Sequence, residues 1–218
     1  MNERIIQELI DSFLKLLLPG IGVTIPLTLI SFTIGLVIAL LVALVVIAKI
    51  PVANRIARIY VWIIRSTPMI VQLFVVYFGL PSIGIKLKPF PSAILVFSLS
   101  VGAYCSETMR ASIESVPEGQ LEAGYCVGMN YIQTMRRIVL PQAFKTAFPP
   151  LSNSLIGLVK DTSLAYSVAI VEILATAQRI AARTYDYFWL YLEAGLIYMI
   201  FCSVFTIIQR KIEAKLER

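Results

Sequence analysis

The chain has 218 residues, of which 58% are hydrophobic and only 15% are charged, and its mean hydropathy is +0.83. Soluble domains usually carry about 45–50% apolar and about 25% charged residues, so a single water-soluble domain is excluded and lipid is the expected solvent. The net charge of +6 is interpreted as reflecting membrane topology and not nucleic-acid binding, because the chain has no nucleic-acid motif.

Histidine is absent, and the three cysteines, Cys105, Cys126 and Cys202, fit no metal-binding or CxxC spacing. A catalytic dyad or triad that needs histidine is therefore impossible. No nucleophile–base constellation is visible either, so we expect neither a metal site nor an enzymatic activity on this chain. Each cysteine is interpreted as a small packing residue.

The first residues predict an amphipathic helix rather than a cleavable signal. Apolar side chains recur at helical spacing over residues 5–17, with charged and polar ones between them. Glu3, Glu8 and Asp11 are incompatible with the basic start of a signal peptide. Such a helix is suited to lying in the membrane interface.

Five apolar stretches follow, each long enough for a membrane span of about 20 residues. The chain is therefore predicted to be an all-α, polytopic membrane protein that forms one domain over residues 1–218. Charges interrupt the fourth stretch most strongly. The predicted spans cover residues 22–47, 56–80, 91–109, 147–171 and 187–208.

Lysine and arginine predict the orientation, because cytoplasmic loops of membrane proteins are rich in both. Five spans place the two ends of the chain on opposite sides, and the richer side implies an N-terminus outside and a C-terminus in the cytoplasm. The side predicted to be cytoplasmic holds Lys49, Arg55, Arg58, Arg110, Arg136, Arg137, Lys145, Arg210, Lys211, Lys215 and Arg218. The other side holds Arg4, Lys15, Lys86, Lys88, Arg179 and Arg183.

The loop between the third and fourth spans, about residues 112–148, is expected to be structured. Residues 115–118 have the form of a capping box, which predicts a helix that runs to Val127. Gly128 can stop this helix in a left-handed conformation, and Asn130 can cap a second short helix that Pro141 ends. The two helices would form a rigid knob for docking a partner, although a mere connection between spans is the alternative.

The chain contains no GxxxxGK[ST] phosphate loop, so any nucleotide hydrolysis must occur on another polypeptide. The sequence Glu122-Ala123-Gly124, with Gly128 and a later Leu140-Pro141, resembles the coupling signature of ABC importer permeases. Three further stretches resemble the polar amino-acid branch of that family: residues 65–73, 103–110 and 158–164. Two positions depart from the family pattern: Gly124 stands where a second Ala is usual, and Ser66 stands where Gly is usual.

This resemblance implies five core helices per subunit, a two-fold pair of permeases that is expected to be a homodimer, an ABC ATPase dimer and an extracytoplasmic substrate-binding protein. ATP would be used by the ATPase, so the permease itself needs no cofactor. The implied location is the bacterial cytoplasmic (inner) membrane. Residues 149–154 look closest to permeases for L-cystine. The coupling contacts implied for the ATPase are Glu122, Ala123, Gly124, Gly128, Leu140 and Pro141.

An amino-acid zwitterion that crosses lipid needs partners for both of its charges. The predicted substrate-binding residues are Lys160, Asp161, Gln72, Thr67, Tyr104 and Glu107. The alternative is that these groups pair between helices and stabilise the bundle, with Glu107 bound to Arg110 one turn away. Arg65 is interpreted as a gate or interface residue, and Glu193 as interfacial.

Two other functions stay open from the sequence. Charged residues within the spans would also fit a secondary amino-acid transporter driven by an ion gradient, but no inverted repeat is evident and the knob would have no purpose. An assembly subunit without a pore of its own is the other possibility.

Overall fold

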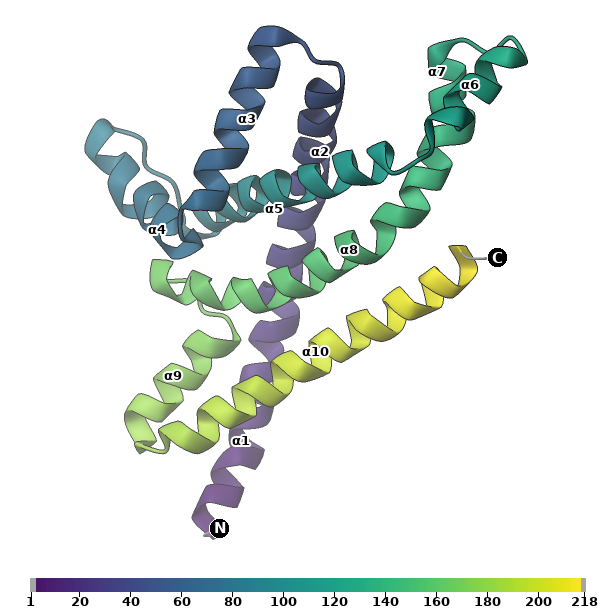
Figure 1. Cartoon of the computed structure of the whole chain (residues 1–218). Helices are drawn as coiled ribbons and strands as arrows, with labels where there is room; N and C mark the ends of the chain where they lie inside the picture. Colours follow the sequence, from purple (N-terminus) through teal and green to yellow (C-terminus); the bar gives the residue numbers. More distant parts are fainter. Residues whose placement is uncertain (1–2, 217–218) are drawn as a thin grey trace.

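The computed structural model describes residues 3–216, and within that range the chain is helical with no strand. Its long helices cross one another in an open arrangement, and the knob extends away from them (Figure 1). The predicted all-α class is confirmed. Arg218, which was assigned to the cytoplasmic side, lies outside the described residues.

The first two predicted elements form a single helix of 45 residues. It consists of α1 (Glu3–Pro19), the π-helical turn η1 (Gly20–Thr24) and α2 (Ile25–Ile47). In the wider turn η1 the backbone N–H of Ile25 donates to the carbonyl oxygen of Gly20, five residues back, so that Pro26 in the first turn of α2 is accommodated without a break in the helix. The predicted amphipathic helix is present, but no turn separates it from the first span, so the expectation of a separate helix in the membrane plane is corrected.

The second predicted span, residues 56–80, is not one straight helix. It is divided into α3 (Pro51–Ser66) and a second arm, and the two are bent by 106°. Pro68 causes the break, because it donates no backbone hydrogen bond and disfavours helical backbone at Thr67, which is extended here. The second arm contains α4 (Met69–Phe74), η2 (Val75–Gly79) and η3 (Leu80–Ile83).

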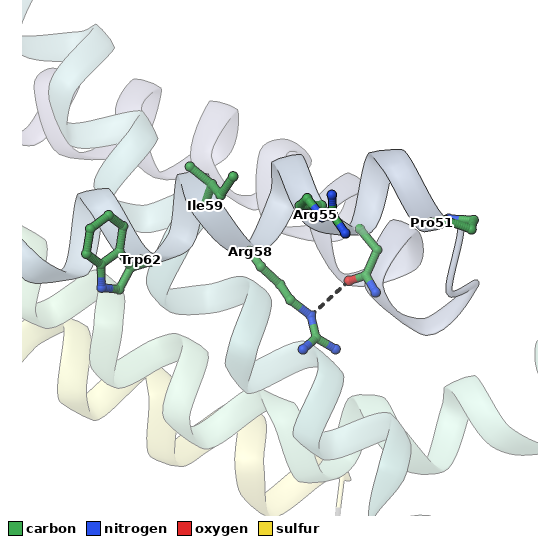
Figure 2. A pocket seen from close by; sticks show the side chains of 6 residues that line it. Pro51, Arg55, Arg58, Ile59 and Trp62 are labelled. Atoms are coloured by element: carbon green, nitrogen blue, oxygen red, sulfur yellow. Dashed lines mark hydrogen bonds between the residues drawn. The ribbon is translucent and has the colours of Figure 1, made fainter.

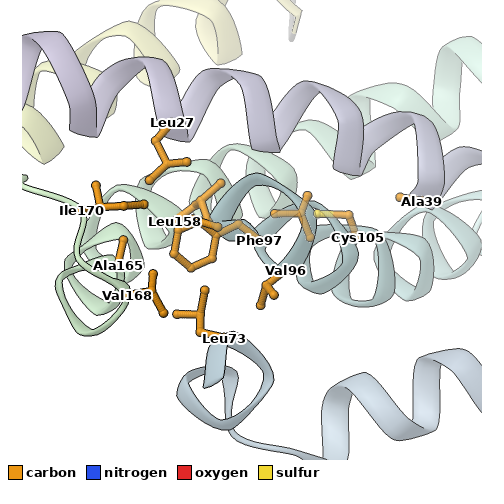
Figure 3. Packing of buried hydrophobic residues seen from close by; sticks show 12 residues of the cluster. Leu27, Ala39, Leu73, Val96, Phe97, Cys105, Leu158, Ala165, Val168 and Ile170 are labelled. Carbon is orange, nitrogen blue, oxygen red and sulfur yellow. The ribbon is translucent and has the colours of Figure 1, made fainter. Parts of the chain in front are cut away.

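Helix α5 (Pro89–Glu114) includes the third predicted span, residues 91–109, and is the central helix of the bundle. In its most apolar stretch 61% of the residues are buried, against 22% in the first helix and 17% in α10. Phe97 of α5 is fully buried among Leu27, Leu73 and Leu158 from three other elements (Figure 3). This cluster joins segments that are far apart in the sequence.

The fourth predicted span, residues 147–171, is part of a longer path. The knob leads into one unbroken helical run over Tyr131–Val168, which is bent by 52° from the helix that follows it. The sequence did not predict this following helix. The elements are α6 (Glu118–Cys126), α7 (Tyr131–Thr134), η4 (Met135–Val139), α8 (Leu140–Asp161), η5 (Thr162–Val168) and α9 (Ile173–Thr184).

Helix α10 (Tyr187–Leu216) contains the fifth predicted span, residues 187–208. Three helices within the described residues are long and apolar enough to cross a membrane alone, and counting each bent pair as one span gives five. The predicted number is therefore reached only with two bent spans.

Candidate functional site

The knob, defined here as residues 118–134, begins differently from the prediction. The predicted capping box at residues 115–118 is wrong, because Pro117 occupies the capping position of α6 and makes no side-chain cap. Ser115 instead ends α5, and its hydroxyl donates to the carbonyl oxygen of Ser112 at 2.8 Å. The tight turn after α5 explains the difference, since it leaves Ser115 facing the helix behind it.

The second half of the knob is as predicted. Helix α6 ends at Cys126, and Gly128 is left-handed with a φ of 79°. Asn130 caps α7 through a reciprocal box with Gln133, whose backbone N–H donates to Asn130 Oδ1 at 2.9 Å. Gln133 Oε1 accepts from the backbone N–H of Asn130 at 3.0 Å. These bonds fix the turn between the two short helices.

Gly124 of α6 packs directly against Thr134 of α7. A methyl group added here would lie 2.4 Å from Thr134 Cγ2 and 2.6 Å from Thr134 Oγ1. Both residues are buried. Gly124 therefore faces the interior of the knob, and this contact is the physical reason for Gly at a position where the resembled signature has Ala.

Pro141 does not end the second helix, which corrects the prediction. The π-helical turn η4 precedes it, and the backbone N–H of Leu140 donates to the carbonyl oxygen of Met135 five residues back. Pro141 then lies in the first turn of α8, where its missing N–H is tolerated. The knob is consequently continuous with α8, as the teal-to-green ribbon in Figure 1 shows.

The outer surface of the knob is free and partly apolar. The side chains of Val127 and Ile132 are 71% and 74% exposed. Glu122, Ala123 and Gly128 of the knob are exposed as well, and so are Leu140 and Pro141 at the start of α8. An exposed apolar surface beside a carboxylate on a rigid support is typical of a protein-docking site.

Two of the predicted substrate residues, Thr67 and Gln72, lie together at the break between α3 and α4. Gln72 Nε2 donates to the carbonyl oxygens of Ile64 at 3.0 Å and Thr67 at 3.1 Å, and to the Thr67 hydroxyl at 2.9 Å. In a regular helix the Ile64 carbonyl would accept from residue 68, but Pro68 has no N–H. The Gln72 amide thus replaces the missing backbone donor and holds the bend in place.

Tyr104 and Glu107, on α5, each interact with an arginine. The guanidinium of Arg65 lies over the Tyr104 ring at 5.3 Å from its centre, which joins the end of α3 to α5. Arg110 binds Glu107 at 2.9 Å and Glu114 at 2.6 Å. The expected pairing of Glu107 with Arg110 is therefore present.

Lys160 and Asp161 differ from the other predicted substrate residues. Both are exposed at the C-terminal end of α8, and neither makes a side-chain hydrogen bond or an ion pair with any residue between 3 and 216. The alternative in which they pair with other helices of the same chain finds no support here. They are free to bind another molecule.

Two buried carboxylates were not recognised from the sequence as structural centres. Glu172 is fully buried and caps α9, because its carboxylate accepts from the backbone N–H groups of Leu174 at 2.9 Å and Ala175 at 2.7 Å. The hydroxyl of Tyr198 also donates to it. An acidic residue directly before an apolar helical run was the available signal.

Glu193 is the other buried carboxylate; the sequence did not predict its burial, and its expected interfacial position stays a prediction. Its side chain is 7% exposed and accepts a hydrogen bond from the Ser12 hydroxyl. Helix α1 covers it, and a contact over such a long sequence separation gives no local signal. Among residues 3–216 no group of three His, Cys, Asp or Glu lies together in a way that could hold a metal ion.

Comparison with known proteins gives one consistent answer. Residues 35–218 match the family described as binding-protein-dependent transport system inner membrane component. The chain is 47% identical to the L-cystine transport system permease protein TcyB of Bacillus subtilis over 209 residues, which are 95% of this chain and 89% of that protein. It is 39% identical to the probable amino-acid ABC transporter permease protein YckA of the same organism, over 94% of this chain and 91% of that protein.

Solved structures agree on the fold. A crystal structure of an amino acid ABC transporter with histidines superposes with a TM-score of 0.88 at 30% identity, over 94% of this chain and 96% of that one. Inward-facing MetNI methionine ABC transporter superposes with a TM-score of 0.70 over all of both chains, and its 20% identity bears on the fold alone. The chain belongs to the family of inner membrane components of binding-protein-dependent transport systems and is the membrane-spanning permease of an ATP-driven ABC importer.

Proposed function

We propose that this permease carries L-cystine, or a polar amino acid closely related to it, into the cell as one half of a homodimer. Its high identity to an L-cystine permease supports the substrate class. Two ATPase subunits and an extracytoplasmic binding protein complete the proposed importer, and ATP is bound and hydrolysed only by the ATPases. In this arrangement the N-terminus lies outside and the C-terminus lies in the cytoplasm.

The observation that carries the mechanism is the unbroken helical run from the knob to Lys160 and Asp161. At a rise of about 1.5 Å per residue, residues 131–161 form a rod about 45 Å long. In the proposed cycle, closure of the ATPases on bound ATP displaces the knob. The rod then moves the charged end of α8 between inward-open and outward-open positions as a rigid body.

Lys160 and Asp161 supply the two charges that an amino-acid zwitterion requires. In the proposed site the Lys160 ammonium binds the substrate α-carboxylate, and the Asp161 carboxylate binds the substrate ammonium group. L-cystine carries two such head groups related by a two-fold axis. A two-fold pair of permeases, each with one Lys160 and one Asp161, would match both ends of this molecule.

Thr67, Gln72, Tyr104 and Glu107 contribute less directly in this proposal. The donors of Gln72 are occupied at the bend, and Glu107 is bound by Arg110. These four residues set the shape of the path, whereas the unpaired charges of α8 contact the substrate.

Transport by the complete importer in proteoliposomes tests the proposal. The permease, its ATPase and its binding protein are reconstituted together, and uptake of labelled cystine is compared with uptake of arginine, glutamine and histidine. We expect uptake to depend on ATP and cystine to be the preferred substrate of the four. Preference for another amino acid would contradict the substrate alone. Uptake that an ion gradient drives without ATP would contradict the coupling mechanism and favour a secondary transporter.

A further inference from the structure

The N-terminal half of α3 bears a basic, partly apolar stripe that the transport mechanism does not use. A hollow of about 440 Å³ runs along it and is lined by Pro51, Asn54, Arg55, Arg58, Ile59 and Trp62. These positions recur at helical spacing and extend for about 16 Å along the helix. None of the predicted substrate or coupling residues lines this hollow. We propose that the stripe binds an anionic phospholipid of the cytoplasmic leaflet.

Within the described part of the chain, residues 3–216, the positive charges of the stripe have no acidic partner. No Asp or Glu occurs anywhere in residues 12–106. None of the ion pairs formed within residues 3–216 involves Lys49, Arg55 or Arg58. The first acidic residues beyond residue 106, Glu107 and Glu114 of α5, are both bound by Arg110. These charges are therefore available to an external anion.

The arginine at the centre of the stripe is held in position for an anion. Arg58 Nε donates to Asn54 Oδ1 at 3.0 Å, which leaves its two Nη groups directed away from α3 (Figure 2). Ile50, the cap position before α3, provides no side-chain cap, so the positive end of the helix dipole is open at the same end of the stripe. A phosphate at this end would contact the guanidinium groups directly.

Apolar side chains continue the stripe toward the membrane interior. Trp62 and Ile59 lie one turn beyond the arginines and are 68% and 49% exposed (Figure 2). Tryptophan at the level of the head groups is typical of proteins that contact lipid. The order of cations followed by apolar groups matches a phosphate head group followed by an acyl chain.

The stripe lies at the same end of the molecule as the knob. The end of α2, at Leu44, Ile47 and Ala48, lines a hollow together with Tyr131 and Arg136 of the knob region. The turn that follows α2 leads directly into α3. In the proposed orientation this end is cytoplasmic, where anionic lipids attract juxtamembrane basic residues.

A second copy of the chain is a less suitable occupant. A two-fold contact through this stripe would place Arg55 and Arg58 against the same residues of the partner, because such interfaces pair a surface with itself. Like charges at a contact are repulsive, and the stripe has no carboxylate to offset them. Lipid phosphate supplies the missing charge without this repulsion.

Native mass spectrometry of the detergent-purified importer complex tests the site, with phosphatidylglycerol as the anionic probe and phosphatidylcholine as the zwitterionic one. We expect the wild type to retain phosphatidylglycerol preferentially. The Arg55→Gln/Arg58→Gln variant should bind it roughly 25-fold more weakly, about fivefold per arginine. The Arg210→Gln/Lys211→Gln variant removes two exposed charges from α10 and should keep wild-type binding.

Equal phosphatidylglycerol binding by the two double variants would overturn the proposal. The proposal would also be overturned if the lipid were lost only when the two permeases separate, because the stripe would then be a contact between copies. If the arginine variant does not fold, a photoreactive phosphatidylglycerol is applied to the wild-type complex. Labelling of the peptide that contains residues 51–66 is expected, and labelling confined to other peptides would refute the site.

Discussion

Replacing Gly124 with Ala tests whether the knob is held together by the close contact of its two helices. The added methyl group would lie 2.4 Å from Thr134 Cγ2, and a carbon–carbon contact this short forces the helices apart. Overpacking of this kind costs about 1–3 kcal/mol. Because the change acts inside the knob, we expect α6 to open locally and ATP-driven uptake to fall.

Hydrogen exchange of the α6 amides measures this opening. A loss of about 1–3 kcal/mol raises the open population about 5- to 150-fold, and the exchange rates should rise by the same factor. Gly119→Ala is the matched control, since it lies on the same helix and a methyl group there meets nothing within 4 Å. It should leave exchange unchanged or slow it, because Ala favours a helix.

The double variant Gly124→Ala/Thr134→Ala makes the test specific. Removing Thr134 Oγ1 and Cγ2 leaves Thr134 Cβ as the nearest of the atoms in contact, at 3.1 Å from the new methyl group. The double variant should therefore regain part of the stability that the single variant loses. The recovery is reduced by about 1 kcal/mol, because the hydrogen bond from the Thr134 hydroxyl to the Asn130 carbonyl is also lost. Exchange as slow in the single variant as in the wild type, or no recovery in the double variant, would refute this account of Gly124.

Four further substitutions test other parts of the structure. Gln72→Leu should lower the thermal stability of the importer by about 1–3 kcal/mol, because the carbonyls at the Pro68 bend lose their donor; a change in apparent substrate affinity with no change in thermal unfolding would point to ligand binding instead. Lys160→Met and Asp161→Asn should each raise the substrate concentration for half-maximal uptake while the protein stays folded, and an unchanged value would remove them from the substrate site. Ser12→Ala leaves the buried Glu193 carboxylate without its donor and should destabilise the packing of α1 on α10 by about 1–3 kcal/mol, as measured by heating the detergent-purified protein.

The sequence predicted those elements that depend only on residues close together in the chain. Apolar runs of sufficient length gave the helical class, since backbone groups in lipid must be satisfied within the helix. Gly128 and Asn130 predicted the turn of the knob, because a left-handed backbone and a cap depend on one or two side chains. The coupling signature around Glu122 then indicated the family.

The interruptions of the helices were harder to predict, because a proline has different effects in different surroundings. Pro68 breaks its helix and bends the second span, whereas Pro141 lies within a continuous helix. The difference depends on what replaces the missing hydrogen bond: Gln72 fixes the bend after Pro68, and the π-helical turn before Pro141 shifts the bonding register.

By itself, the sequence determined that this chain is a helical membrane permease with a structured knob and two charged residues, Lys160 and Asp161, within its fourth span. Only the tertiary structure decided which polar groups are free. Glu172 and Glu193 are enclosed by residues distant in sequence, and Gln72 is committed to a bend, whereas Lys160 and Asp161 have no partner within residues 3–216. Such pairings depend on how separate helices meet, and helical periodicity carries no information about that.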